Sequence, residues 1–200
     1  MARITQLTVG GLPTAWSSLG FSFDDSRCTF GDVAVRVDPS REPGLVSWTL
    51  GRVAVMESPD GLETNFDDRV VNAASSSSII DVRGIDHVVV MTNDLQRTTE
   101  AIARVTGDPL KRVREAGEGI RQGFHRLGSV VVEVVENPRV TQTYLWGFAL
   151  TVANLDDVVA HMGPDVIGSP RDAVQPGRRI ATIRSGVGLG VPVALITPDA

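Results

Sequence analysis

The sequence has one cysteine, Cys28, among its 200 residues. A lone cysteine excludes an internal disulfide and a zinc site built from cysteine pairs. No stretch approaches the ~18 apolar residues of a membrane-spanning helix. The first residues, 1–6, also lack the long apolar core of a signal peptide. These absences predict a soluble cytoplasmic protein with no membrane partner.

Clusters of basic side chains are absent as well. The chain carries 19 Lys and Arg against 24 Asp and Glu, a formal charge of −5, and Lys111 is its only lysine. Without a basic patch or stripe, nucleic acid is not an expected partner. The composition is otherwise ordinary, with 42% hydrophobic residues, and a chain of this length can bury a real core as one large or two small domains.

An internal repeat is the most informative feature of the chain. Two apolar strands about sixty residues apart each lead into a helix opener with a leucine, and further matches follow. The matching pairs are 84–91 with 144–151, 119–128 with 177–186, and 131–138 with 191–198. Each copy reads as strand, helix and three strands (βαβββ), and a duplication of this kind usually dictates the architecture.

The repeat predicts two modules, residues 84–138 and 144–198, within a domain that covers 84–200. Helices are expected over 95–106, capped by Asn93 or Asp94 and ended by Gly107, and over 155–162, ended by Gly163. Both helices should cover the convex side of the shared sheet. Residues 57–83, with four serines at 75–78 and weak periodicity, predict a long connection or flexible linker.

The N-terminal segment, residues 1–56, shows a compressed version of the same order. A weakly alternating strand is predicted over 4–9, a short helix over 12–19, and strands over 21–23, 29–37 and 45–55. This order is compatible with a degenerate third module.

Two polar residues lie where the strands are otherwise apolar. His87 shares a strand face with Val89, and Glu133 shares one with Val131. A carboxylate on an apolar face costs several kcal/mol unless it is paired, hydrogen-bonded or metal-bound. If both residues line one cavity, they can meet at a cation such as Zn, Fe, Mn or Ni. The alternative is a solvated Glu133 and a hydrogen-bonded His87 with no shared role.

The run from Ile85 to Val90, followed by Asp94 and Leu95 and closed by residues 132–136, resembles the vicinal oxygen chelate superfamily. Glyoxalase I, bleomycin-resistance proteins and extradiol dioxygenases belong to it, and the similarity spans about 84–198. The resemblance implies an α+β fold in which paired βαβββ modules form a curved half-barrel sheet around a small-molecule cavity. The N-terminal eighty residues match it far less well.

The same resemblance implies where a metal would bind. The matching positions are His87, Glu133, Gly147 and Ala194, and only the first two carry side chains that can ligate a metal. The expected cofactor is therefore either none or a single divalent metal held by His87 and Glu133.

Four further residues are candidates for ligand binding. Arg121 and His125 share one face of a strand, and His125 can act as an acid or base near neutral pH. Gln175 precedes a Pro-Gly turn, and Arg179 follows it on a strand. An arginine there can form a bidentate pair with a carboxylate or phosphate. The competing interpretation is that these side chains are solvated or pair with nearby acids.

Three functions remain open from the sequence. The favoured one is a glyoxalase-like protein that binds a small, anionic or aromatic molecule, with catalysis unresolved. The alternative is a metal-dependent lyase, isomerase or dioxygenase whose substrate chelates the metal through adjacent oxygens. A degenerate module kept for assembly alone is the third. Because a single module leaves an open sheet edge, residues 3–55 are also expected to contribute to a homodimer interface.

Overall fold

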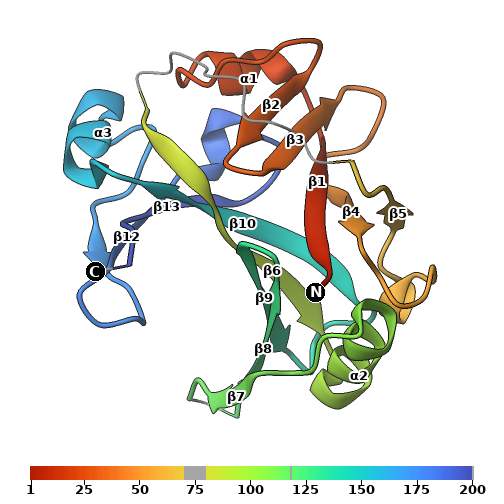
Figure 1. Ribbon diagram of the computed structural model, residues 1–200. Helices are drawn as coiled ribbons and strands as arrows, with labels where there is room; N and C mark the ends of the chain where they lie inside the picture. Colours follow the sequence, from red (N-terminus) through yellow and green to blue (C-terminus); the bar gives the residue numbers. More distant parts are fainter. Residues whose placement is uncertain (70–79, 118, 200) are drawn as a thin grey trace.

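The computed structural model describes residues 1–69, 80–117 and 119–199 and contains two curved β-sheets (Figure 1). The serines at 75–78 lie outside the described residues. No helix in the described ranges is long and apolar enough to cross a membrane.

The larger sheet is built from two successive βαβββ modules. The first contains β6 (Val82–Thr92), α2 (Leu95–Thr106), β7 (Arg112–Glu115), β8 (Arg121–Leu127) and β9 (Val130–Glu136). The second contains β10 (Tyr144–Val152), α3 (Leu155–Met162), β11 (Arg171–Asp172), β12 (Arg179–Thr182) and β13 (Val193–Ile196).

The two modules are arranged symmetrically about the centre of this sheet. The strand order is β11-β12-β13-β10-β6-β9-β8-β7. In each module the first strand pairs in parallel with the last, and the two first strands, β6 and β10, pair antiparallel at the centre. The predicted α+β fold with two modules in one curved sheet is confirmed.

Local chemistry places the two helices where the sequence predicts them. The side chain of Asp94 accepts a hydrogen bond from the backbone of Arg97, and Gly107 ends α2 with a left-handed φ of 73°. Asp94 is thus a standard N-cap and Gly107 a standard C-cap. α3 ends at Gly163. α2 packs on β8 and β9, and α3 packs on β12.

The smaller sheet comes from the N-terminal residues. Its elements are β1 (Arg3–Gly10), α1 (Pro13–Ser17), β2 (Arg27–Phe30), β3 (Val33–Asp38), β4 (Gly44–Gly51), the 3-10 turn η1 (Pro59–Gly61) and β5 (Thr64–Phe66). The strand order is β2-β3-β1-β4-β5.

This smaller sheet has the connectivity of two incomplete modules rather than one. β1 pairs in parallel with β3, as β6 does with β9, and β4 pairs in parallel with β5, as β10 does with β13. β1 and β4 pair antiparallel at the centre, as β6 and β10 do. The strand predicted over 45–55 is β4, and it therefore begins a second unit. β5 lies within residues 57–83, for which a connection is predicted.

Other N-terminal boundaries also differ from the prediction. Residues 21–23 form no strand, because the rings of Phe21 and Phe23 instead pack against Trp16, with centroids 5.6 and 5.8 Å away. The strand predicted over 45–55 ends at Gly51, since Arg52 adopts a positive φ of 56°.

The two sheets share one hydrophobic core. Leu7 and Trp48 from the smaller sheet and Val88 and Leu150 from the larger are fully buried in the same cluster. Strand alternation then turns the polar residues of both sheets outward. The molecule consequently has two polar sheet faces on opposite sides of a common core.

Candidate functional site

The outward face of the eight-stranded sheet holds a cavity of about 390 Å³. Its walls come from both modules, with His87, Glu133 and Gln122 on one side and Ile180, Ile196 and others on the other. This volume lies within the range usual for small-molecule sites.

Strand register explains why His87 and Glu133 line the same cavity. In the parallel pair of β6 and β9, Val89 lies opposite Glu133, so His87 and Glu133 point to the same face two positions apart. Across the antiparallel pair of β8 and β9, Phe124 lies opposite Glu133 and faces the same space. The two candidate residues are therefore neighbours in one wall.

A chain of polar contacts orients His87. Its Nδ1 lies 2.7 Å from Oδ2 of Asp86, and the buried guanidinium of Arg178 donates to the other oxygen of Asp86. Burial opposes ionisation of Asp86, but the hydrogen bonds from His87 and Arg178 outweigh it and hold the pKa of Asp86 below its usual value. With Nδ1 engaged, Nε2 is the ring nitrogen left for a ligand.

A second chain of contacts holds Glu133. Nε2 of Gln122 donates to Oε1 of Glu133 at 2.6 Å, and Nε of Arg114 donates to the Gln122 carbonyl at 3.0 Å. Burial raises the pKa of Glu133, while the charges of His87 and Arg114 partly oppose the shift. A raised pKa favours the protonated form of a carboxyl, which suits the group to proton exchange with a ligand.

The second module contributes no metal-binding side chain at the matching positions. A Cβ on Gly147 would collide with the backbone oxygen of Pro192, so packing requires a glycine there. Ala194, on the same face of β13 as Ile196, ends in a methyl group. Within the described ranges, no three His, Cys, Asp or Glu side chains gather as metal ligands do. Two donors fall short of the three protein ligands of a catalytic zinc site.

Arg121 and His125 are not part of this cavity, in contrast to their selection as ligand-binding candidates. Both lie on the face of β8 that α2 covers. Arg121 forms an ion pair with Glu136 at 2.7 Å, and His125 is buried, which lowers its pKa. In the pairing of β8 with β9, Gln122 and Phe124 are the residues of β8 that point into the cavity.

Of the two candidates around the Pro-Gly turn, one lines the cavity and the other does not. Gln175 lines the cavity. Arg179 turns to the helical side, where its guanidinium contacts the Asp156 carboxylate of α3 at 2.7 Å. Its neighbour Arg178 instead supports the site through Asp86.

Asp86 and Arg178 are functional candidates that sequence reasoning missed. Asp86 directly precedes His87, and regular alternation would send it to the opposite face. A register irregularity in β6 between Ile85 and His87 changes this alternation. The adjacent acid and histidine are the available signal, while the partner Arg178 lies 92 residues away in sequence and only the fold brings it close.

Comparison with known proteins identifies the fold. No family model and no curated protein matches the chain. Among solved structures, methylmalonyl-CoA epimerase from Mycobacterium tuberculosis superposes with a TM-score of 0.53 at 18% identity, covering 63% of this chain and 95% of that one. The chain has the vicinal oxygen chelate fold. Methylmalonyl-CoA epimerase in complex with methylmalonyl-CoA and NH4+ matches with a TM-score of 0.50 at 20% identity, covering 60% of this chain and 96% of that one.

The vicinal oxygen chelate fold therefore accounts for under two thirds of the chain. A Streptomyces coelicolor methylmalonyl-CoA epimerase variant in complex with 2-nitronate-propionyl-CoA gives the same coverage, 60% of this chain and 96% of that one, with a TM-score of 0.50 at 20% identity. Likeness at such identities concerns the fold, and function has to be argued from the site.

Proposed function

We propose that the protein binds a small organic molecule with an apolar body and a negatively charged group in the cavity between its two modules. The observation that carries the proposal is the composition of the cavity wall. Polar side chains from both modules, among them His87, Glu133 and Gln175, lie beside the apolar side chains of Ile180 and Ile196. Polar groups placed among apolar side chains in one cavity are typical of small-molecule sites.

The charge of the cavity favours an anionic ligand. Arg112, Arg114 and Arg171 line it against Asp172 and Glu133, so positive groups outnumber negative ones. The Arg112 guanidinium lies 5.0 Å from the centre of the Phe124 ring. A ring-bearing anion would contact this apolar and cationic pair together.

The proposed catalytic capacity is confined to His87 and Glu133. The contact of Nδ1 with Asp86 orients His87, and burial raises the pKa of Glu133 above its usual value. The two groups can thus bind, orient and exchange protons with a ligand.

NMR titration of the full-length protein with benzoate and its neutral counterpart benzyl alcohol tests the proposal. Benzoate should shift amide signals of β8 and β9 saturably and bind at least about tenfold more tightly, because a hydrogen bond to a charged group contributes about 1.5–3 kcal/mol. Arg114→Gln should remove that preference, and Arg139→Gln, an exposed arginine outside the cavity, should preserve it. Equal binding of both probes, or shifts elsewhere only, contradicts the proposal.

A metal-dependent lyase, isomerase or dioxygenase is the second candidate. The support is His87, with Nε2 free, beside Glu133 on one face, at positions that match ligands in the superfamily. The incomplete donor set argues against tight binding, so freshly purified protein should retain little or no divalent metal. Elemental analysis showing close to one metal per chain, lost in His87→Ala but not in His161→Ala, would reverse the preference between the two candidates.

A further inference from the structure

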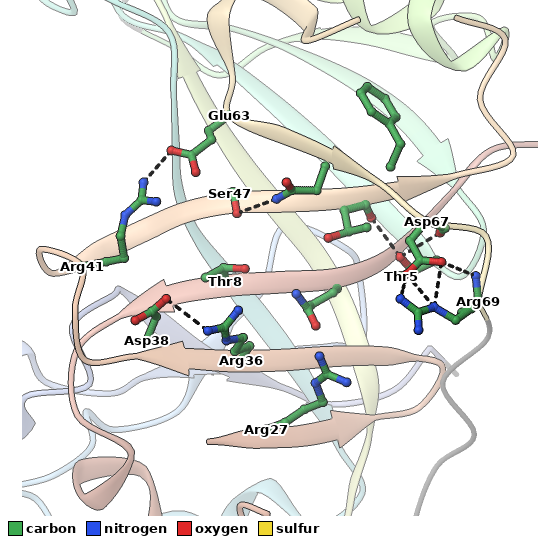
Figure 2. Close-up of a pocket in the computed structure, with 14 residues that line it drawn as sticks. Thr5, Thr8, Arg27, Arg36, Asp38, Arg41, Ser47, Glu63, Asp67 and Arg69 are labelled. Atoms are coloured by element: carbon green, nitrogen blue, oxygen red, sulfur yellow. Dashed lines mark hydrogen bonds and ion pairs between the residues drawn. The ribbon is translucent and has the colours of Figure 1, made fainter. Parts of the chain in front are cut away.

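The outward face of the N-terminal sheet forms a second hollow, of about 740 Å³, on the other side of the core (Figure 2). The residues that line it are almost all polar and come from β1 to β5 and the adjoining loops. Its size is within the range of ligand-binding cavities. We call it the N-terminal hollow.

One row of residues crosses the floor of this hollow in register. Arg27 on β2 lies opposite Arg36 on β3, Arg36 lies opposite Thr8 on β1, and Thr8 lies opposite Ser47 on β4. Like charges directly opposite each other on neighbouring strands are destabilising. A negative charge beside Arg27 and Arg36, at one end of the row, would therefore be stabilising.

The side chains of the described residues provide that charge only in part. Asp38 lies 3.4 Å from Arg36, and it also accepts hydrogen bonds from the backbone and hydroxyl of Ser40. Within the described part of the chain, the Arg27 guanidinium has no hydrogen-bond or ion-pair partner. Figure 2 shows both guanidiniums on the same face of the sheet.

The other charges of the hollow are already matched. Arg41 pairs with Glu63 at 2.6 Å, and Arg69 pairs with Asp67 at 2.7 Å. Four arginines against three acids leave one positive charge, and it falls on Arg27. A local positive excess is notable in a chain whose net charge is −5.

Hydroxyl groups line the centre of the floor. Thr8, Ser47 and Thr49 line the hollow and are largely buried. Ser47 accepts a hydrogen bond from Asn65, whereas the hydroxyls of Thr8 and Thr49 have no partner among the described residues. Hydroxyls that line a hollow and have no protein partner are available to a ligand.

We propose that the N-terminal hollow is a second binding site, for a small organic anion. The oxygens of its carboxylate or phosphate group bridge Arg27 and Arg36, and the Thr8 hydroxyl, next in the same row, donates to the ligand. Guanidinium forks suit both kinds of oxyanion. This site is independent of the cavity at His87, which lies on the opposite side of the core.

NMR titration of the full-length protein in a Tris buffer of low ionic strength tests the site. Inorganic phosphate and malonate serve as separate probes that distinguish the two sources of charge. At least one should shift the amides of β2 and β3 saturably. Arg27→Gln and Arg36→Gln should each weaken this binding at least about tenfold, whereas Arg139→Gln, an exposed arginine outside both cavities, should leave it unchanged.

A thermal measurement checks the same proposal without depending on full occupancy. Without anion, Arg27→Gln should unfold at a temperature no lower than the parent, because it removes a repulsion. On addition of the binding anion, the parent should gain stability and Arg27→Gln should not. The proposal is overturned if neither probe binds saturably, or if Arg139→Gln weakens binding as much as Arg27→Gln does.

Discussion

At the scale of single residues, the support of His87 depends on a buried ion pair. Asp86 has a side-chain exposure of 13% and Arg178 of 5%. Removing one partner of a buried pair leaves an uncompensated charge, which typically costs about 3–5 kcal/mol. Asp199 and the carbonyl of Thr197 also contact Arg178, so the lower end of that range is expected here.

Asp86→Asn should therefore reduce the free energy of unfolding by about 3 kcal/mol. The matched control is Asp81→Asn, which removes an ion pair with Arg83. Both side chains of this pair are more than half exposed. Exposed pairs contribute about 0–1 kcal/mol. Chemical denaturation of both variants checks this, and equal losses would show that the contact with Arg178 does not support the site.

Two glutamates on β9 should respond to pH with opposite signs. Burial raises the pKa of Glu133 above 4.5, so its ionisation favours the unfolded chain as the pH rises. The hydrogen bond from Arg121 lowers the pKa of Glu136 below 4.5, so its ionisation favours the folded chain.

Glu133→Gln should accordingly become increasingly more stable than the parent as the pH rises from 4 to 8. Glu136→Gln should be less stable than the parent at pH 8, and this deficit should shrink as the pH falls below 4.5. Denaturation at several pH values measures both differences. Parallel curves for the two variants would contradict the assignment of Glu133 as a buried carboxyl.

At the scale of secondary-structure elements, local signals allowed the helices to be predicted and tertiary contacts decided the rest. Asp94 and Gly107 fix the ends of α2 by short-range chemistry. On β8, alternation defines two faces but not which one meets the cavity. The pairing of Phe124 with Glu133 decides it, and no short-range signal in residues 121–127 contains that pairing.

The N-terminal sheet shows the same limit. β5 falls in a segment for which a connection is predicted, and the pairing of β1 with β3 in parallel and with β4 antiparallel is set by long-range contacts. Likewise, Arg179 meets Asp156 only because α3 packs beside β12. The candidate residues His87 and Glu133 are predicted from their apolar neighbours in sequence, whereas the support of His87 by Arg178 depends on the fold.

Close packing of β10 against the residues before β13 explains why position 147 is a glycine. A methyl group on Gly147 would meet the Pro192 backbone oxygen. Gly147→Ala should therefore lower the free energy of unfolding by about 1–3 kcal/mol. Gly186→Ala, where nothing lies within 4 Å of the added methyl, should stay within about 0.5 kcal/mol of the parent. Equal behaviour of the two variants in urea denaturation would mean that β10 can move away.

At the scale of the whole molecule, the homodimer expected from the sequence remains a prediction. The N-terminal sheet already packs on the larger sheet within one chain, but its outer strands, β2 and β5, each have one neighbour in the sheet. Such edges can pair with a second copy. We expect light scattering to show a dimer for the full chain, with residues 3–55 contributing to its interface. A monomeric full chain would contradict the prediction.

Trp16 joins the two halves of the molecule. Its ring stacks on Phe148 of β10, with centroids 6.1 Å apart and planes 9° apart, and its Nε1 donates to the carbonyl of Leu189 at 3.1 Å. The side chain is fully buried. Because the sheets share one core around it, they should unfold in a single transition.

Trp16→Ala should lower the free energy of unfolding by about 3–5 kcal/mol, and amide signals from both sheets should still disappear together on denaturation. Trp146→Ala, which truncates an indole that is 43% exposed, should cost at most about 1 kcal/mol. The cavity at His87 and the N-terminal hollow lie on opposite faces of this core. Separate transitions for the two sheets in the parent protein would show that the core does not couple them, and each face would then have to be treated as a site on an independent domain.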